Sequence, residues 1–350
     1  MRHLTRRQSS PLVIGAVGLL VLSGCAASPA ESGESSAAGT EDAAGAEASD
    51  FWDSSTVHSL SVDVDPDALD DLLSTYEGSG EKVWIEATVT IDGVTHERVG
   101  LKLKGNSSLR GVTSDDDPGT IPWIIRLDKY VDGQNHGGTT EFVVRGNSSE
   151  TALNEAVALE LLESTSLASE AAAATRFTIG DSTSLRLVVE NPGDAWNEST
   201  LLATALYKAE SGGDYSYRGE DPDSYTDVFD QEAGEDDLTP LISFLEFIND
   251  SDDETFAAEL DEHLDVTAFA TYLAFHDLVD NFDDIDGPGN NSYLAYDAET
   301  GLMTVVSWDL NLAFGASPTS GGDQGGPAGG ADAGVEGMVD APQGARPDGE

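Results

Sequence analysis

Cysteine and basic residues are scarce in this 350-residue sequence, and each scarcity excludes a class of protein. The chain has one cysteine, Cys25, so no disulfide can form within it. Lysine and arginine together number 16, against 66 aspartates and glutamates, and the formal net charge is -50. Nucleic acid is therefore excluded as a partner, because binding a phosphate backbone needs a basic footprint. Residues 51–317 also lack an apolar run long enough to span a bilayer.

The apolar run at the N-terminus is typical of an export signal. Three arginines precede apolar residues 11–22, and this run is too short for a permanent membrane anchor. The sequence Leu22-Ser23-Gly24-Cys25 then resembles the lipobox of bacterial lipoproteins, which implies a lipid on the Cys25 sulfur and cleavage before that residue. We expect residues 1–24 to be a lipoprotein signal peptide and the mature chain to be lipid-anchored on the extracytoplasmic face of the cell membrane. The alternative is a plain secretory signal with an incidental cysteine.

Two segments lack the periodic apolar positions of a folded core. Residues 25–50 are small and acidic, which predicts a disordered tether. Residues 318–350 are rich in glycine, alanine and aspartate, which predicts a disordered tail. The 51–317 region between them is long enough for a sizeable core and for two lobes that share a cleft.

The first half of this region has the alternating apolar pattern of strands. Asp65-Pro66 predicts the start of a short helix, because aspartate favours the N-cap and proline the first helical position. Leu153, Val157 and Leu161 have helical spacing and predict a helix over residues 147–163. The predicted strands are residues 57–64, 83–91, 99–104, 123–127, 141–145, 177–179 and 185–189.

Helices are predicted after residue 225. Thr239-Pro240 begins one helix, residues 254–264 form a second, and Asp265 caps a third that ends near residue 280. Strands at 292–296 and 303–308 are predicted to pair as a hairpin. We therefore expect an α+β fold with a β-rich first lobe at about 51–225, and a helical second lobe with a late β-hairpin at about 226–317.

The densest chemistry lies in residues 280–315. Four acids and three asparagines fall within twelve residues of predicted loop, 280–291. Crowded carboxylates repel one another unless a cation or a shared proton compensates. This loop therefore predicts a metal site or an acid–base site.

A series of short motifs extends over most of the folded region. The motifs are Lys-Gly-Asn-Ser-Ser at 104–108, Arg126-Leu127-Asp128, Asn154-Glu155, Glu190, Leu206-Tyr207-Lys208, Asn290-Asn291 before Tyr293-Leu294, and Trp308-Asp309-Leu310 ahead of Phe314-Gly315. In this order they resemble the CotH kinase family, which is similar to atypical secreted kinases. The resemblance implies a two-lobed protein-kinase-like fold. It also implies transfer of the γ-phosphoryl group of ATP, with Mg²⁺ or Mn²⁺, to serine or threonine in serine-rich protein substrates.

Phosphoryl transfer needs a carboxylate beside the attacking hydroxyl and oxygen ligands for the metal. Asp286 and Asn291 are separated by four residues, as are the catalytic aspartate and the metal-binding asparagine of the kinase catalytic loop. The resemblance therefore implies Asp286 as the base, with Asn291 and Asp309 as metal ligands. Asp283 or Asp284 takes the base role if the loop register differs.

Lys104, Arg126 and Lys208 are the candidates for binding the ATP phosphates, because each lies in or beside a predicted strand. A buried cation needs an anionic partner, and Glu190 is the predicted partner of one of them. His276 lacks metal-ligand spacing, and we expect it not to be catalytic.

One motif departs from the family pattern. Asp309-Leu310-Asn311 stands where the family often has two aspartates, so an amide replaces one carboxylate. Two alternatives to the kinase therefore stay open. One is a nucleotidyl transferase with the same ligands, and the other is a catalytically inactive surface lipoprotein that acts as a binding or adhesion module.

Overall fold

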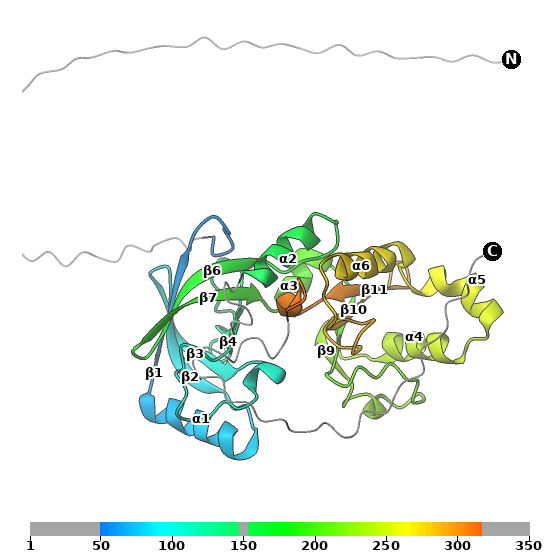
Figure 1. Ribbon diagram of the computed structural model, residues 1–350. Coiled ribbons are helices and arrows are strands. Elements are labelled where there is room, and N and C mark those ends of the chain that lie inside the picture. Colours follow the sequence, from blue (N-terminus) through cyan, green and yellow to red (C-terminus); the bar gives the residue numbers. More distant parts are fainter. Residues whose placement is uncertain (1–49, 147–152, 317–350) are drawn as a thin grey trace, which may run out of the picture. The chain divides into compact units, whose positions relative to one another are not determined.

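The computed structural model describes residues 50–146 and 153–316, and the fold is a mixture of α-helices and β-sheets (Figure 1). Cys25, the predicted signal peptide and the predicted tail lie outside the described residues. Within the described ranges, none of the helices is long and apolar enough to cross a membrane.

Seven strands close into a barrel in the order β1-β2-β3-β4-β5-β7-β6 (Figure 1). Neighbouring strands are antiparallel except β1 and β6, which run parallel and close the barrel. A β-rich first lobe was predicted, and the closure of its strands into a barrel leaves that sheet without free edges. The bounds are β1 His58–Val64, β2 Ile85–Ile91, β3 Val94–Leu103, β4 Trp123–Arg126, β5 Glu141–Val144, β6 Ala172–Ile179 and β7 Ser182–Glu190.

Helix α1 (Pro66–Ser79) follows β1 as the Asp65-Pro66 signal predicted. The Asp65 side chain accepts the backbone N–H groups of Asp67 and Ala68. The apolar face of α1 packs into the barrel core through Leu69, Leu72 and Leu73.

A second sheet has four strands in the order β11-β10-β8-β9. Their bounds are β8 Ala205–Ala209, β9 Phe229–Ala233, β10 Ser292–Asp297 and β11 Leu302–Ser307. The predicted hairpin is confirmed as β10 and β11. Strand β8, which lies in the range predicted for the first lobe, pairs with β10 and therefore belongs to the sheet of the hairpin.

The three predicted late helices are confirmed as α4 (Thr239–Asp250), α5 (Asp253–His263) and α6 (Val266–Leu278). The Asp265 carboxylate caps α6 by accepting the Ala268 N–H at 2.9 Å. Helices α5 and α6 pack against β11. The shorter helices are η1 Ser107–Leu109, α3 Asp194–Trp196, η2 Asn197–Leu201, η3 Pro222–Ser224 and η4 Leu310–Leu312.

Helix α2 (Asn154–Glu163) lies in the predicted range 147–163, of which residues 147–152 are outside the described residues. Leu153, Val157 and Leu161, whose spacing predicted the helix, are 50%, 48% and 41% exposed. The face of the helix that is turned to the interior carries Glu155, which is buried and accepts a hydrogen bond from Arg145. The buried residues of the helix are Glu155, Ala158, Leu159 and Leu162.

One apolar cluster joins the barrel to the second sheet. It includes Val143 of β5 together with Tyr293, Val306 and Trp308. The closed barrel therefore stands where a β-rich lobe was predicted, and it shares a core with the sheet that carries the hairpin.

Candidate functional site

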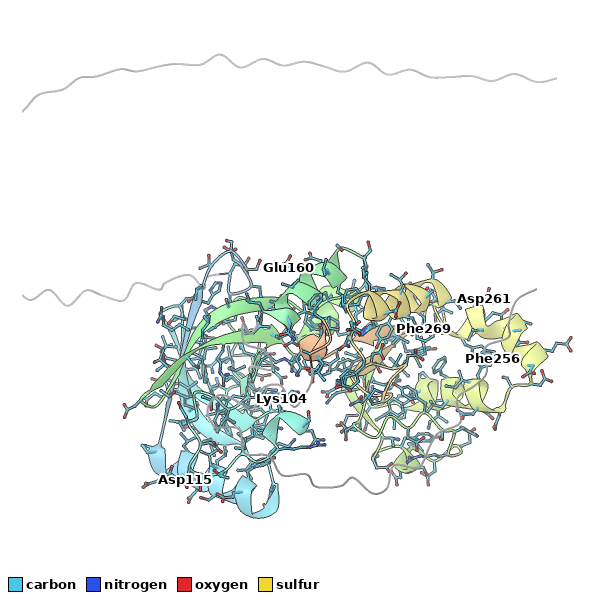
Figure 2. All side chains as sticks on the ribbon, viewed as in Figure 1. Lys104, Asp115, Glu160, Phe256, Asp261 and Phe269 are labelled. Carbon is cyan, nitrogen blue, oxygen red and sulfur yellow. The ribbon has the colours of Figure 1, made fainter. Side chains whose placement is uncertain are left out.

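Lys104 and Arg145 occupy equivalent positions at one end of the barrel. Strands β3 and β5 both pair antiparallel with β4, so they run parallel to each other. Leu103 and Val144 are both in register with Trp123. Lys104 directly follows Leu103, and Arg145 directly follows Val144, so two cations lie at the same end of the barrel. Lys104 is labelled in Figure 2.

Arg145 is the centre of a buried charge cluster. Its Nε donates to Glu155 Oε2 at 2.8 Å, and its Nη2 donates to Asp309 Oδ1 at 2.6 Å. The side chains of Arg145 and Glu155 are 10% and 5% exposed. Burial disfavours the Arg145 charge, but Asp309 and Glu155 outweigh that effect and raise the pKa of its guanidinium. The guanidinium also lies 5.1 Å from the Trp308 ring centre.

Sequence reasoning did not find Arg145, although a signal was present. Arg145 begins the pentapeptide Arg-Gly-Asn-Ser-Ser at 145–149, which repeats the Lys-Gly-Asn-Ser-Ser that begins at Lys104. Both pentapeptides start directly after a barrel strand. The repeat would have directed attention to both cations.

Asn291 and Asp309 meet at the open end of the β10–β11 hairpin. Ser292 pairs with Ser307, and the Trp308 N–H beyond this pair donates to Asn291 O at 3.2 Å. Both candidate metal ligands have left-handed backbone, with φ 53 at Asn291 and φ 59 at Asp309. Asparagine and aspartate tolerate this conformation better than other residues with side chains.

Asp283 joins Asn291 and Asp309. Asn291 Nδ2 donates to Asp283 Oδ2 at 2.8 Å. Burial first, and the nearby Asp309 charge second, raise the pKa of the Asp283 carboxyl. Asp286, the base implied by the loop spacing, is exposed, and its backbone N–H donates to Asp284 at 3.2 Å. Of the three acids that the sequence left open, Asp283 is therefore the one that is hydrogen-bonded to Asn291 and affected by the Asp309 charge.

Asp284 and His276 hold the acidic loop against β11. Asp284 Oδ1 accepts the Gly287 N–H at 3.0 Å, which closes the loop on itself. His276 is 1% exposed; its Nε2 lies 3.0 Å from Ser307 Oγ, and its Nδ1 lies 3.5 Å from Asp284 Oδ2. Burial lowers the pKa of His276 to about 4, so its ring is neutral at pH 7. His276 connects the acidic loop to β11, the strand that ends before Asp309.

The residues at the hairpin end fit a divalent cation. The carboxylate of Asp309 lies close enough to Asp283 for its charge to disfavour ionisation of Asp283 and raise its pKa. The buried Asn290 Oδ1 has no hydrogen-bond partner among the described residues. No group of three or more histidines, cysteines and acids suited to a metal occurs in the described ranges. Magnesium does not need such a group, because it commonly binds one or two carboxylates and completes its coordination shell with phosphate oxygens and water.

Lys104 and Lys208 are the cations best placed for phosphates. Lys104 Nζ donates to Asn191 Oδ1 at 3.2 Å and lies 5.6 Å from the Trp308 ring centre. Burial and the Lys208 charge lower the pKa of Lys104 to about 8. Lys208 Nζ is 3.8 Å from a Glu210 oxygen and 3.9 Å from a Glu232 oxygen, so its ion pairs are long.

Arg126 and Glu190 do not join this cluster. Arg126 is already paired, with Asp128 at 2.8 Å and Glu141 at 3.3 Å, and its side chain is 42% exposed. Glu190 was predicted as the partner of a phosphate-binding cation, but its carboxylate accepts the Ala171 N–H at 2.8 Å. The ion pairs of the described residues assign Glu210, Glu232, Asp128 and Glu141 to the cations instead.

Glu170 is a further buried acid near Arg145 that sequence reasoning missed. It is 3% exposed, and burial raises its pKa to about 8. Glu170 is therefore mostly protonated at pH 7. The charge of Arg145 is balanced by Glu155 and Asp309.

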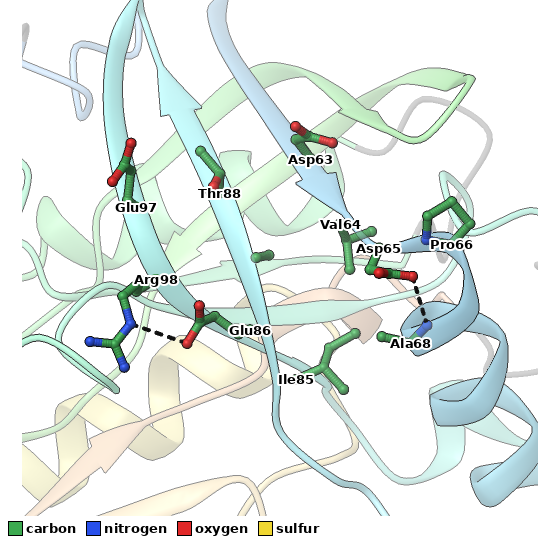
Figure 3. A pocket seen from close by; sticks show the side chains of 11 residues that line it. Asp63, Val64, Asp65, Pro66, Ala68, Ile85, Glu86, Thr88, Glu97 and Arg98 are labelled. Atoms are coloured by element: carbon green, nitrogen blue, oxygen red, sulfur yellow. Dashed lines mark hydrogen bonds and ion pairs between the residues drawn. The ribbon is translucent and has the colours of Figure 1, made fainter.

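A separate surface depression lies on the barrel wall, formed by β1, β2, β3 and the start of α1 (Figure 3). Its volume is 780 Å³, and its lining includes Asp63, Asp65, Glu86 and Glu97. The one cation there, Arg98, pairs with Glu86 at 3.3 Å. Phosphates would be repelled by this lining, so the depression is not the candidate site.

Comparison with known proteins agrees with the motif pattern. The family model described as CotH kinase protein matches residues 104–337, a span that begins at Lys104 and includes Arg145, Glu155, Asp283, Asn291 and Asp309. No curated protein matches the chain.

Proposed function

The chain belongs to the CotH kinase family, and from that membership we propose that it is a metal-dependent kinase that transfers the γ-phosphoryl group of ATP to serine or threonine of a protein substrate. The observation that carries the proposal is the contact of Arg145 with both Glu155 and Asp309. Protein kinases use a strand cation paired with a helix glutamate, next to a metal-binding aspartate. Arg145 after β5, Glu155 on α2 and Asp309 after β11 have that relationship.

Each residue of the site has a role in this proposal. Asn291 and Asp309 would hold the metal, which when bound neutralises charge on the nucleotide phosphates. Lys104 and Lys208 attract the phosphates, and Arg145 fixes the orientation of the Asp309 carboxylate. A carboxylate of the acidic loop accepts the proton from the substrate hydroxyl as the new P–O bond forms and the bond to the ADP oxygen breaks.

We assign the base role to Asp283 and not to Asp286. The hydrogen bond from Asn291 supports this choice, because it ties the Asp283 carboxylate to a candidate metal ligand. We expect Asp283→Asn to lower the turnover number about 100-fold, a usual contribution of a positioned base. Asp286→Asn, at an exposed site in the same loop, should stay within about threefold of wild type. Initial-rate measurements on both variants would reverse the assignment if Asp286→Asn is the slower enzyme.

Calorimetric titration of ATP into the purified protein, with and without Mg²⁺ or Mn²⁺, tests the nucleotide site. Lys104 carries its positive charge below its pKa of about 8 and loses it as the pH rises through that value. The Kd for ATP should therefore rise about tenfold between pH 7 and pH 9, because the affinity falls as Lys104 loses its charge. Lys104→Gln should bind weakly at both pH values, whereas Arg176→Gln, on the exposed barrel surface, should behave as wild type. Absence of ATP binding with either metal would contradict the kinase and favour an inactive binding or adhesion module.

The kinase-like two-lobed fold is also a proposal. We assign the barrel to the first lobe and the four-stranded sheet with α4, α5 and α6 to the second. The pairing of β8 with β10 supports a division between β7 and β8. The charge cluster would then lie where the lobes meet, since Arg145 comes from the barrel and Asp309 from the sheet.

Location and substrate complete the proposal. We propose that a lipid on Cys25 anchors the protein on the extracytoplasmic face of the cell membrane, in keeping with the lipobox-like Leu22-Ser23-Gly24-Cys25. A substrate at that location is itself exported or exposed on the surface. A serine-rich acceptor protein is the class implied by the family resemblance.

A further inference from the structure

All five lysines of the chain belong to one electrostatic cluster. They are Lys82, Lys102, Lys104, Lys129 and Lys208. The lysines form a continuous electrostatic series: the charges of Lys82 and Lys129 lower the pKa of Lys102, and the charge of Lys208 lowers the pKa of both Lys82 and Lys104. In a chain with a net charge of -50, this cluster is a local reversal of sign.

The carboxylates of the protein leave most of this charge unpaired. Within the described ranges, no ion pair joins Lys82, Lys102, Lys104 or Lys129 to an acid. Burial is the first cause that lowers the pKa of Lys82, Lys102 and Lys104, and the largest charge effect on each comes from another lysine. Carboxylates act in the opposite direction but come after that lysine; they are Glu141, Glu210 and Glu232. Such a cluster of like charges favours an anionic ligand.

Two of the lysines lie over the ring of the half-buried Trp84. Lys102 Nζ lies 4.5 Å from the Trp84 ring centre, and Lys129 Nζ lies 5.2 Å from it. Gly100 makes this packing possible, because a Cβ there would lie 2.7 Å from Lys129 Cβ and 3.0 Å from Trp84 Cε3. Lys82 extends the group toward Lys104 by donating from Nζ to Gly105 O at 2.8 Å. The lysines are thus held in place by the barrel.

The proposed nucleotide does not use all of these cations. Lys104, which lies over Trp308 next to Asp309, and Lys208 are the two cations assigned to the triphosphate. The positive charge extends beyond these cations to Lys82, Lys102 and Lys129, which lie farther from Asp309. Their position therefore suits a second anionic molecule whose reacting group lies at the Asp309 end.

We infer that Lys102 and Lys129, which lie over Trp84, form the acceptor site together with Lys82 and bind an acidic stretch of the protein substrate near its phosphorylated serine or threonine. The inference rests on the proposed kinase function, because that function places phosphoryl transfer beside Asp309. The closed barrel offers no edge strand for pairing, so side chains must provide the recognition. An acidic polypeptide is repelled by most of a protein with this net charge and attracted to this one surface.

Binding of a labelled peptide to the full-length protein, without ATP, tests the inference. The probe is a synthetic peptide of glutamate and serine, compared with a peptide of equal length in which glutamine replaces glutamate. We expect the acidic peptide to bind at least about tenfold more tightly at low salt, and to lose this preference as ionic strength rises. Lys102→Gln combined with Lys129→Gln should weaken the acidic peptide about tenfold. The charge-matched control, Arg98→Gln with Arg176→Gln, should leave its Kd unchanged.

Each outcome separates this inference from the kinase proposal. Peptide binding that persists with a saturating non-hydrolysable ATP analogue and Mg²⁺ supports a separate acceptor site. This result supports a separate peptide site even if no phosphoryl transfer is found. Three results overturn the inference: equal affinity for the acidic and neutral peptides, displacement of the peptide by the nucleotide, or lysine-dependent binding of phosphatidylglycerol vesicles without peptide binding. A kinase that phosphorylates neutral acceptors as well as acidic ones would overturn the inference and leave the proposed function intact.

Discussion

Asp309→Asn should abolish nearly all phosphoryl transfer, with a loss of about 1,000-fold, while the protein remains folded. The substitution removes the charge that a metal needs but keeps the shape of the side chain. Asparagine also tolerates the left-handed backbone at this position, where φ is 59. Glu155 still contacts Arg145 in this variant, so the buried cation keeps an anionic partner.

The measurements are initial rates of ADP release and calorimetric ATP binding with and without metal. The metal-dependent part of the ATP affinity should disappear together with the activity. The matched control is Asp297→Asn, which removes a carboxylate in the β10–β11 turn that accepts the Glu299 N–H. Retention of more than about a tenth of the wild-type rate in Asp309→Asn would exclude Asp309 as a metal ligand.

Arg145→Met should give the largest loss of stability among single substitutions at the site, about 3–5 kcal/mol. It leaves Glu155, whose side chain is 5% exposed, without its cation, and it leaves Asp309 without one of its partners. Desolvating an unpaired carboxylate costs far more than the net contribution of the pair. Urea denaturation of the variant and of wild type measures this difference in the free energy of unfolding.

Two further variants make that prediction specific. Arg145→Met with Glu155→Gln should recover about half of the loss or more, because the buried charge is removed with its partner. Arg126→Met should cost less than about 1 kcal/mol, because its pairs with Asp128 and Glu141 are partly exposed. If the double variant is no more stable than Arg145→Met alone, buried charge is not the cause. Both Arg145 variants should also lose activity, because Asp309 is no longer held by a guanidinium.

The sequence predicted the local elements with good accuracy, because their signals lie within a few residues. Asp65 and Asp265 cap the helices they were predicted to cap, and the late hairpin forms where alternation indicated it. The spacing of Leu153, Val157 and Leu161 predicted α2 but not its buried face, since all three residues are exposed. Spacing alone cannot tell which face of a helix is buried when a charged residue such as Glu155 has a partner in the core.

The candidate site was only partly predictable. Asn291, Asp309, Lys104 and Lys208 were named from motifs, and the structure brings each near another candidate. Arg145 was missed, because its importance comes from Asp309, which is 164 residues away in the chain. The choice among the loop acids also needed the contact between Asp283 and Asn291.

The sequence by itself determined the charge balance, the absence of disulfides, the helix caps, the hairpin and the family motifs. All of these are properties of composition or of neighbouring residues. Only the tertiary structure decided that the first seven strands close into a barrel, that β8 joins the hairpin, that Lys104 lies over Trp308, and that Arg145 contacts Asp309. The physical reason is that strand pairing and burial of charge depend on partners far apart in the chain. Their free energies depend on which distant surfaces come together, and no local pattern records that choice.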